Sequence, residues 1–123
     1  MKLFDSHCHL DDKSYNRDLD KVIKRARRAG VVRLMTIGVN GKTSAHAVEL
    51  VESHPEIYAS VGVHPHDVKS CRESVIEALK SLAVNPKVRA WGEIGLDFNR
   101  MYSPRIDQEM WFEKQLEIAD QLG

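Results

Sequence analysis

Two histidines separated by one residue lie near the start of the chain, in the segment DSHCHLD (residues 5–11). Because side chains alternate between the faces of a strand, His7 and His9 point to one side of an extended segment and Cys8 points to the other. This spacing lets two neutral imidazoles chelate one ion such as zinc, manganese, iron or nickel. A metal site needs at least one further ligand. The structural alternative to a metal site is that both histidines lie in the core and are hydrogen-bonded there.

A carboxylate in a later segment is the candidate for the third ligand. Glu93 lies in WGEIGLD (residues 91–97), a largely apolar run in which an unpaired buried carboxylate is strongly disfavoured. Its two oxygens can bridge two ions, which also makes it the candidate catalytic residue. The flanking glycines, Gly92 and Gly95, are expected to leave space for close backbone approach. A buried ion pair is the structural alternative for this glutamate.

Other polar side chains occupy two loops that could meet a substrate. His64 and His66 flank Pro65, which stiffens a tight turn, and they could contact a negatively charged substrate or carry protons near neutral pH. Loop capping is the alternative role for both. In the loop after residue 93, Tyr102 could stack on a base or sugar and Arg105 could pair with a phosphate.

The apolar pattern predicts the elements that must position these residues. Strands are expected over residues 3–10, 31–39, 57–64 and 88–94, and helices over residues 16–29, 42–53, 72–83 and 104–122. Four alternating strand-helix units predict a parallel sheet with right-handed crossovers, an α/β fold. The candidate residues follow the carboxyl ends of the strands, the edge at which such sheets and barrels bind ligands.

Length, charge and cysteine content limit the classes of function. A chain of 123 residues suits one domain, residues 1–123, and its 18 basic and 18 acidic residues cancel, which gives no general attraction to nucleic acid or membrane. Cys8 and Cys71 are too few and too far apart for a disulfide framework or a cysteine zinc site. No apolar run suits a signal peptide or a membrane span, so a cytoplasmic location without membrane partners is expected.

A basic cluster in the first predicted helix and just after it invites a different interpretation. Its members are Lys21, Lys24, Arg25, Arg27, Arg28 and Arg33. They lie opposite the apolar stripe of the helix, so the pattern favours a solvated surface over a nucleic-acid-binding patch.

Four motifs together resemble the TatD family of metal-dependent deoxyribonucleases. They are DSHCHL (residues 5–10), GVHPH (62–66), GEIGLDF (92–98) and the helical pattern Q-x3-F-x2-QL (108–116), and the similarity covers essentially the whole chain. The first motif alone is weak, because amidohydrolase-like barrels share it. The GEIGLD stretch following GVHPH in this order is specific.

The resemblance implies a β/α barrel that holds one or two divalent metal ions (Mg, Mn or Zn). It also implies hydrolysis of phosphodiesters in DNA, with RNA as a further substrate, as a 3'-5' exonuclease. By the same resemblance, His7 and His9 would bind one ion, Glu93 would bind both, and His64 and His66 would line the substrate pocket. The ions would activate a bound water and neutralise charge on phosphoryl oxygens.

The four units correspond to the N-terminal half of a (β/α)8 TIM-type barrel, whose eight units need about twice this length. The later metal ligands of the family have no counterpart here. Open sheet edges and an exposed inner face predict self-association or pairing with another chain. Two alternatives stay open: another amidohydrolase-like hydrolase acting on C–N or phosphotriester bonds, and a catalytically inactive half-barrel that serves as an interaction module.

Overall fold

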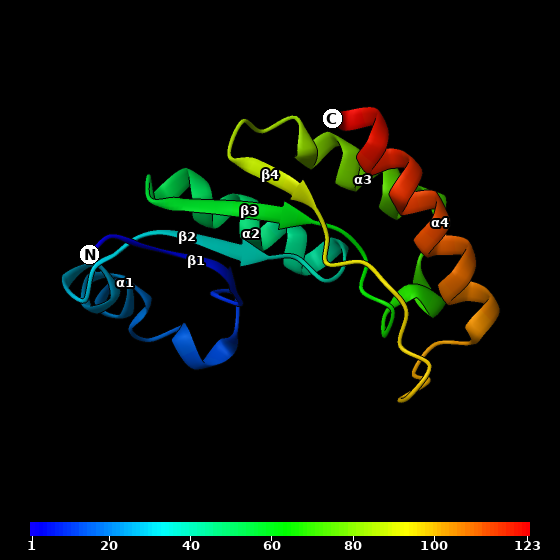
Figure 1. Ribbon diagram of the computed structural model, residues 1–123, viewed down its shortest axis with the longest axis horizontal. Helices are drawn as coiled ribbons and strands as arrows, with labels where there is room; N and C mark the ends of the chain where they lie inside the picture. The colour runs from blue at the N-terminus through cyan, green and yellow to red at the C-terminus, as the bar shows by residue number, and fades with distance from the viewer.

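The structure is a computed structural model that describes residues 1–123. Four parallel strands form one sheet in the order β1-β2-β3-β4, and their arrows point the same way in Figure 1. The strands are β1 (Leu3–Cys8), β2 (Val31–Ile37), β3 (Ile57–Val61) and β4 (Val88–Trp91). The helices are α1 (Leu19–Arg28), α2 (Gly41–Ser53), α3 (Glu73–Ala83) and α4 (Arg105–Leu122), with short 3-10 turns η1 (Lys13–Tyr15) and η2 (Val68–Ser70).

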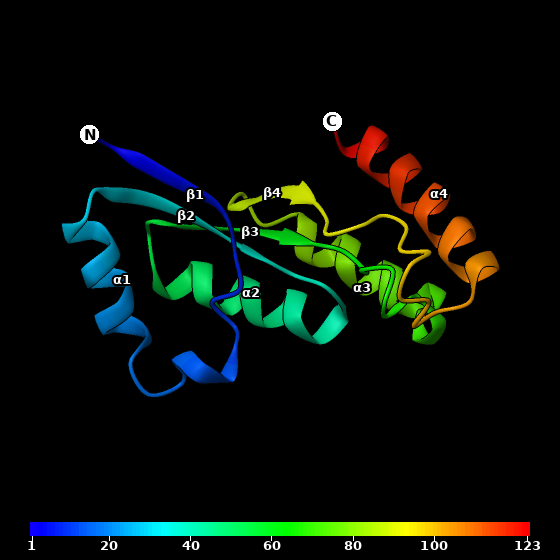
Figure 2. The same ribbon diagram turned by 60° about the horizontal axis from the view of Figure 1, so that its bottom comes forward.

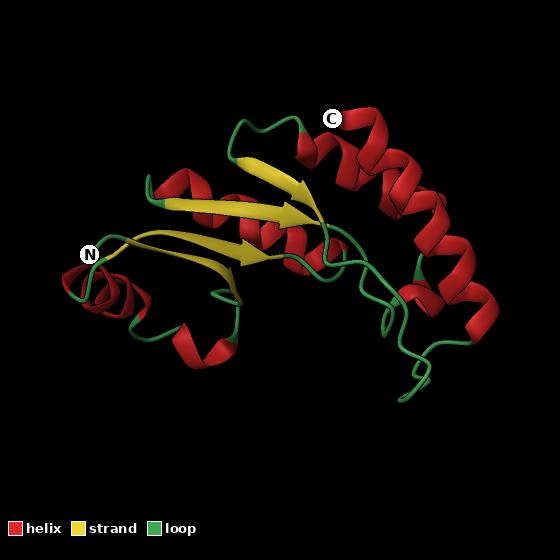
Figure 3. Cartoon of the chain, viewed as in Figure 1, coloured by secondary structure: helices red, strands yellow, loops and turns green.

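The alternation of strands and helices confirms the predicted order of elements (Figure 3). Three of the four helices begin within one residue of their predicted starts. The first is the exception: it begins at Leu19, and residues 16–18 instead form a turn that continues from the 3-10 turn η1. Asp12 caps that turn by accepting a hydrogen bond from the backbone N–H of Ser14 at 2.8 Å.

The predicted strands extend two or three residues too far at their carboxyl ends. Beyond the ladder, the backbone remains tied to neighbouring segments by isolated hydrogen bonds. Glu93 N–H donates to the carbonyl of Gly38 at 2.9 Å, and His64 N–H donates to that of Val39 at 2.8 Å. These bonds fix the candidate residues close to the sheet edge although they lie outside the regular strands.

Close backbone approach at this edge depends on a glycine other than those expected. A Cβ on Gly62 would lie 2.9 Å from the carbonyl carbon of Gly92, a contact that real side chains do not make. A Cβ on Gly92 would meet its nearest atom only at 3.9 Å, and one on Gly95 would meet none within 4 Å. The prediction that Gly92 and Gly95 provide the space is therefore wrong; Gly62 allows the end of β3 to approach the segment after β4.

The hydrophobic core lies between the sheet and the helices on one of its sides. Figure 2 shows α1, α2 and α3 on the same side of the sheet and α4 apart from them, beyond β4. Two clusters fill this layer: one lies around α3 and α4 and includes Ile76, Leu79 and Trp111, and the other joins α1 and α2 to the sheet through Ile23 and Val51. The six basic residues in and just after α1 are all exposed, and their interpretation as a solvated surface stays a prediction.

The two outer strands leave open edges, as the sequence predicts. β1 and β4 each have one neighbour in the sheet, and Leu3 and Phe4 of β1 are exposed. Unpaired strand edges with apolar side chains favour pairing with another chain. Self-association and a cytoplasmic location stay predictions. No helix combines the length and the apolar character needed to cross a membrane.

Candidate metal centre

Three potential ligands converge at the carboxyl edge of the sheet. His7 lies in β1, His9 follows that strand, and Glu93 lies two residues beyond β4. One nitrogen or oxygen from each lies within 4.8 Å of the others, and His7 Nε2 lies 3.6 Å from Glu93 Oε2. A flat sheet would separate β1 from β4 by three strand spacings, about 14 Å. The convergence therefore depends on the curl of the sheet, as in the wall of a barrel.

The three side chains fit a divalent ion after a small adjustment. Two ligands bound about 2.1 Å from one ion can be at most about 4.2 Å apart. The 4.8 Å spread must therefore close slightly, and the side chains of His7 and Glu93 are exposed enough to rotate, at 54% and 36%. A set of two imidazoles and one carboxylate suits zinc or manganese.

Cys8, between the two histidines, is directed away from this group. Its thiol donates to the carbonyl of Met35 at 3.2 Å, and the side chain packs against the core cluster of α1 and α2. Burial, assisted by the charges of Asp5 and Asp11, raises the pKa of this thiol to about 12. The thiol therefore stays protonated at neutral pH, as expected of a group that does not bind metal.

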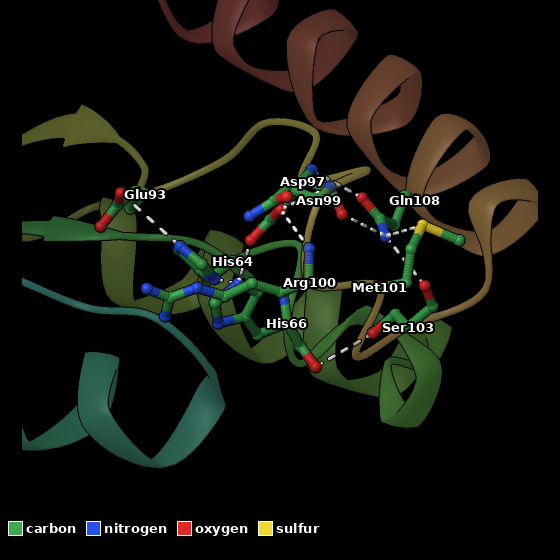
Figure 4. A network of polar contacts seen from close by, with 9 residues as sticks. All are labelled: His64, His66, Glu93, Asp97, Asn99, Arg100, Met101, Ser103 and Gln108. Atoms are coloured by element: carbon green, nitrogen blue, oxygen red, sulfur yellow. Dashed lines mark hydrogen bonds and ion pairs between the residues drawn. The ribbon is translucent and has the colours of Figure 1, made fainter.

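Glu93 lies between the two histidines of the candidate metal centre, His7 and His9, and the GVHPH loop. Its Oε1 is 3.7 Å from Nε2 of His64, whereas its Oε2 is the oxygen near His7 (Figure 4 shows the His64 contact). Burial lowers the pKa of His64, and the neighbouring Glu93 carboxylate opposes part of that effect. His64 is not among the three clustered ligands, and its place in the substrate pocket stays a prediction.

His66 is paired with a second carboxylate. Its Nε2 lies 2.5 Å from Asp97 Oδ2, and its ring packs edge-on against Tyr102 with centroids 4.8 Å apart (Figure 4 shows the His66 and Asp97 region). Asp97 also accepts hydrogen bonds from the backbone N–H groups of Asn99 and Arg100, each at 3.0 Å. The backbone bond from Arg100 and then the His66 bond are the main reasons that the pKa of Asp97 falls to about 2.

Arg105 is engaged within its own segment. Its Nε donates to Glu109 at 2.7 Å, and its guanidinium lies over the Phe98 ring, 4.4 Å from the centroid. A phosphate contact would use the remaining guanidinium donors, and this role stays a prediction. Tyr102 is 56% exposed, which leaves its ring open to a ligand.

Two buried glutamines on α4, both part of the fourth motif, hold the loops of the site, a role that the sequence pattern did not indicate. Gln108 Oε1 accepts from the Asp97 N–H at 2.8 Å, and its Nε2 donates to the carbonyls of Asp97 and Ser103. Gln115 accepts from the Val63 N–H at 2.8 Å and donates to the Val63 carbonyl at 3.0 Å. The available signal was their spacing: seven residues apart, both lie on the buried face of the helix.

The Asp97 network gives a prediction for titration. The folded pKa of Asp97, about 2, lies below its ordinary 3.8, so this carboxylate stabilises the fold above pH 3.8 and the contribution is lost as the pH falls through about 2. Replacing His66 with phenylalanine should raise the Asp97 pKa, yet leave it below 3.8, because the backbone N–H groups of Asn99 and Arg100 still donate. Carboxyl carbon NMR measures this titration.

The control for this titration replaces a histidine that faces another carboxylate. His54 Nε2 lies 3.7 Å from Asp20 Oδ1, so His54→Phe should leave the Asp97 titration unchanged. If His66→Phe also left it unchanged, the contact between His66 and Asp97 would not contribute to the low pKa.

Comparison with known proteins places these observations in a family. The sequence model of the TatD related DNase family matches residues 4–123. A 3'-5' ssDNA/RNA exonuclease TatD of Musicola paradisiaca is 39% identical over 122 residues, covering 98% of this chain and 46% of that protein. An uncharacterized metal-dependent hydrolase, YabD of Bacillus subtilis, is 37% identical over 121 residues, covering 98% of this chain and 48% of that protein.

Solved structures agree with this assignment. YJJV, a TatD homologue from Escherichia coli, has a TM-score of 0.88 and 28% sequence identity, covering 98% of this chain and 47% of that chain. The present chain thus spans about half the length of the relatives it matches. Its four strand-helix units match the N-terminal half of the TatD barrels, which confirms the predicted fold class. The chain belongs to the family of TatD related DNases.

Proposed function

We propose that the chain provides the first metal-binding residues of a divalent-metal-dependent phosphodiester hydrolase that acts on DNA or RNA as a 3'-5' exonuclease. The convergence of His7, His9 and Glu93 at one edge of the sheet is the observation that carries the proposal. The name of the Musicola relative, a 3'-5' ssDNA/RNA exonuclease, supports the substrate class, and that of the Bacillus relative supports metal dependence.

The residues divide into those that would hold the ion and those that would meet the substrate. His7, His9 and Glu93 would hold it, with Glu93 as the catalytic carboxylate. A divalent ion bound there supplies a water of lowered pKa and positive charge near the phosphoryl oxygens. His64 and His66, each next to a carboxylate, would line the substrate pocket beside Glu93.

The loop after β4 would hold the nucleoside. Tyr102 presents an exposed aromatic ring beside His66, and stacking on such rings is how proteins bind unpaired bases without reading their sequence. Arg105 would add a positive charge near the phosphates, using the guanidinium nitrogens that do not face Glu109.

A substrate panel tests this proposal. The chain is incubated with Mn²⁺ or Mg²⁺ and single-stranded DNA labelled at its 5' end, with EDTA as the metal-free control. Stepwise shortening from the 3' end, lost in EDTA, is the expected result. Hydrolysis of phosphotriesters or amides without DNA cleavage would favour an amidohydrolase-like activity. Absence of stoichiometric metal binding and of any cleavage would favour an inactive interaction module for this chain.

A further inference from the structure

The turn formed by His64, Pro65 and His66 determines which nitrogen of the His64 ring carries the proton. The backbone N–H of His66 donates to His64 Nδ1 at 3.1 Å. A neutral imidazole has one donor nitrogen and one acceptor nitrogen. A backbone N–H can only donate, so Nδ1 must be the acceptor and the proton of the neutral ring lies on Nε2.

The protonated edge of the ring faces the carboxylate of the metal centre. His64 Nε2 lies 3.7 Å from Oε1 of Glu93, whereas Oε2 lies 3.6 Å from Nε2 of His7. A small shift of either side chain would bring His64 Nε2 and Glu93 Oε1 within hydrogen-bond range. The Glu93 carboxylate thus has Oε1 directed at the His64 donor and Oε2 directed at His7.

The His64 ring has little freedom to turn away. Its backbone N–H donates to Val39 at 2.8 Å, and its side chain is only 22% exposed. The His66 ring packs against it edge-on, with centroids 4.3 Å apart, and His66 is itself held by Asp97. The orientation of the His64 ring is therefore fixed by its backbone bond to Val39 and by the His66 ring, and not by His7 or His9.

We propose that His64 is a positioning residue: it directs Nε2–H at an oxygen of the metal centre, Glu93 Oε1 at 3.7 Å in this structure, and is not a metal ligand. Binding an ion through Nε2 would require the proton on Nδ1 and the loss of the His66 hydrogen bond. Holding Oε1 turns Oε2 toward His7. The positioning role rests on the proposed metal-binding function, whereas the tautomer does not.

The tautomer is measured first, on the wild-type chain without metal. Long-range ¹H–¹⁵N NMR at about pH 8.5, where an ordinary imidazole is neutral, distinguishes protonated from bare ring nitrogens. His64→Gln assigns the His64 signals by their disappearance. A protonated Nε2 with a bare Nδ1 is the expected result. Predominance of the Nδ1–H form would overturn the proposal.

Two matched substitutions then separate the two nitrogens. His64→Gln places an amide donor near the Nε2 position, and His64→Asn places an acceptor near the Nδ1 position and removes the donor. Calorimetric Mn²⁺ affinity should stay within about threefold of wild type in His64→Gln and fall about 10–100-fold in His64→Asn, the size of effect seen for groups that orient metal ligands. The unfolding temperature of each metal-free variant monitors its fold.

The outcomes distinguish this proposal from the one on which it depends. Absence of binding to the wild-type chain would overturn the proposed function. Binding that is equal in both variants, or stronger in His64→Asn, would overturn the positioning role alone. Tighter Mn²⁺ binding by His64→Gln than by His64→Asn, together with the Nε2–H tautomer, would support the proposed function and the positioning role.

Discussion

Replacing Glu93 with glutamine is expected to lower the affinity of the chain for a divalent ion by more than about 100-fold, because loss of a direct ligand exceeds the 10–100-fold effect of losing an outer partner. Glutamine keeps the shape of the side chain but removes its negative charge. His7 and His9 alone are an incomplete site. Calorimetry with Mn²⁺ or Zn²⁺ measures the change directly.

Thermal unfolding gives a second measure of the same effect. An ion at 100 times its dissociation constant stabilises the folded chain by about 2.7 kcal/mol. This metal-induced rise in unfolding temperature should disappear in Glu93→Gln, whereas the metal-free unfolding temperature should change little because the side chain is partly exposed. Glu52→Gln, at an exposed carboxylate on α2, is the matched control and should keep the wild-type response. Unchanged binding in Glu93→Gln would mean that Glu93 is not a ligand.

The order and direction of the fold elements follow from the sequence because each apolar strand segment is followed by a segment of helical period. The strand ends do not follow from it. Val39 and Ile94 are as apolar as strand residues, yet they lie beyond the regular ladder, where isolated bonds such as Glu93 N–H to Gly38 replace it. Hydrophobicity does not report this change in hydrogen bonding.

The convergence of His7, His9 and Glu93 could be predicted because carboxyl ends of parallel strands share one edge, and a barrel curls that edge so that β1 and β4 approach each other. The contact between His66 and Asp97 could not, since it joins loops 31 residues apart and depends on the path of each loop. A pattern search that counts only apolar positions also overlooks glutamines on the buried face of a helix.

Gln115 gives the largest expected loss of stability. Its amide satisfies both the N–H and the carbonyl of Val63, a buried residue within the GVHPH segment. Gln115→Leu fills a similar volume but leaves these two buried backbone groups without partners, at about 1–3 kcal/mol each. The free energy of unfolding, measured by urea denaturation, should therefore fall by roughly 2–6 kcal/mol.

Gln121→Leu is the control because it makes the same change at an exposed position near the end of α4, and it should alter the free energy of unfolding by less than about 0.5 kcal/mol. Val63 directly precedes His64, so Gln115→Leu should also disturb the His64 ring, which the same long-range NMR experiment detects. Equal stability of the two variants would mean that the Val63 backbone finds other partners. In that case α4 would support the sheet through its apolar contacts alone, with Trp111 and Ile118 as the main ones.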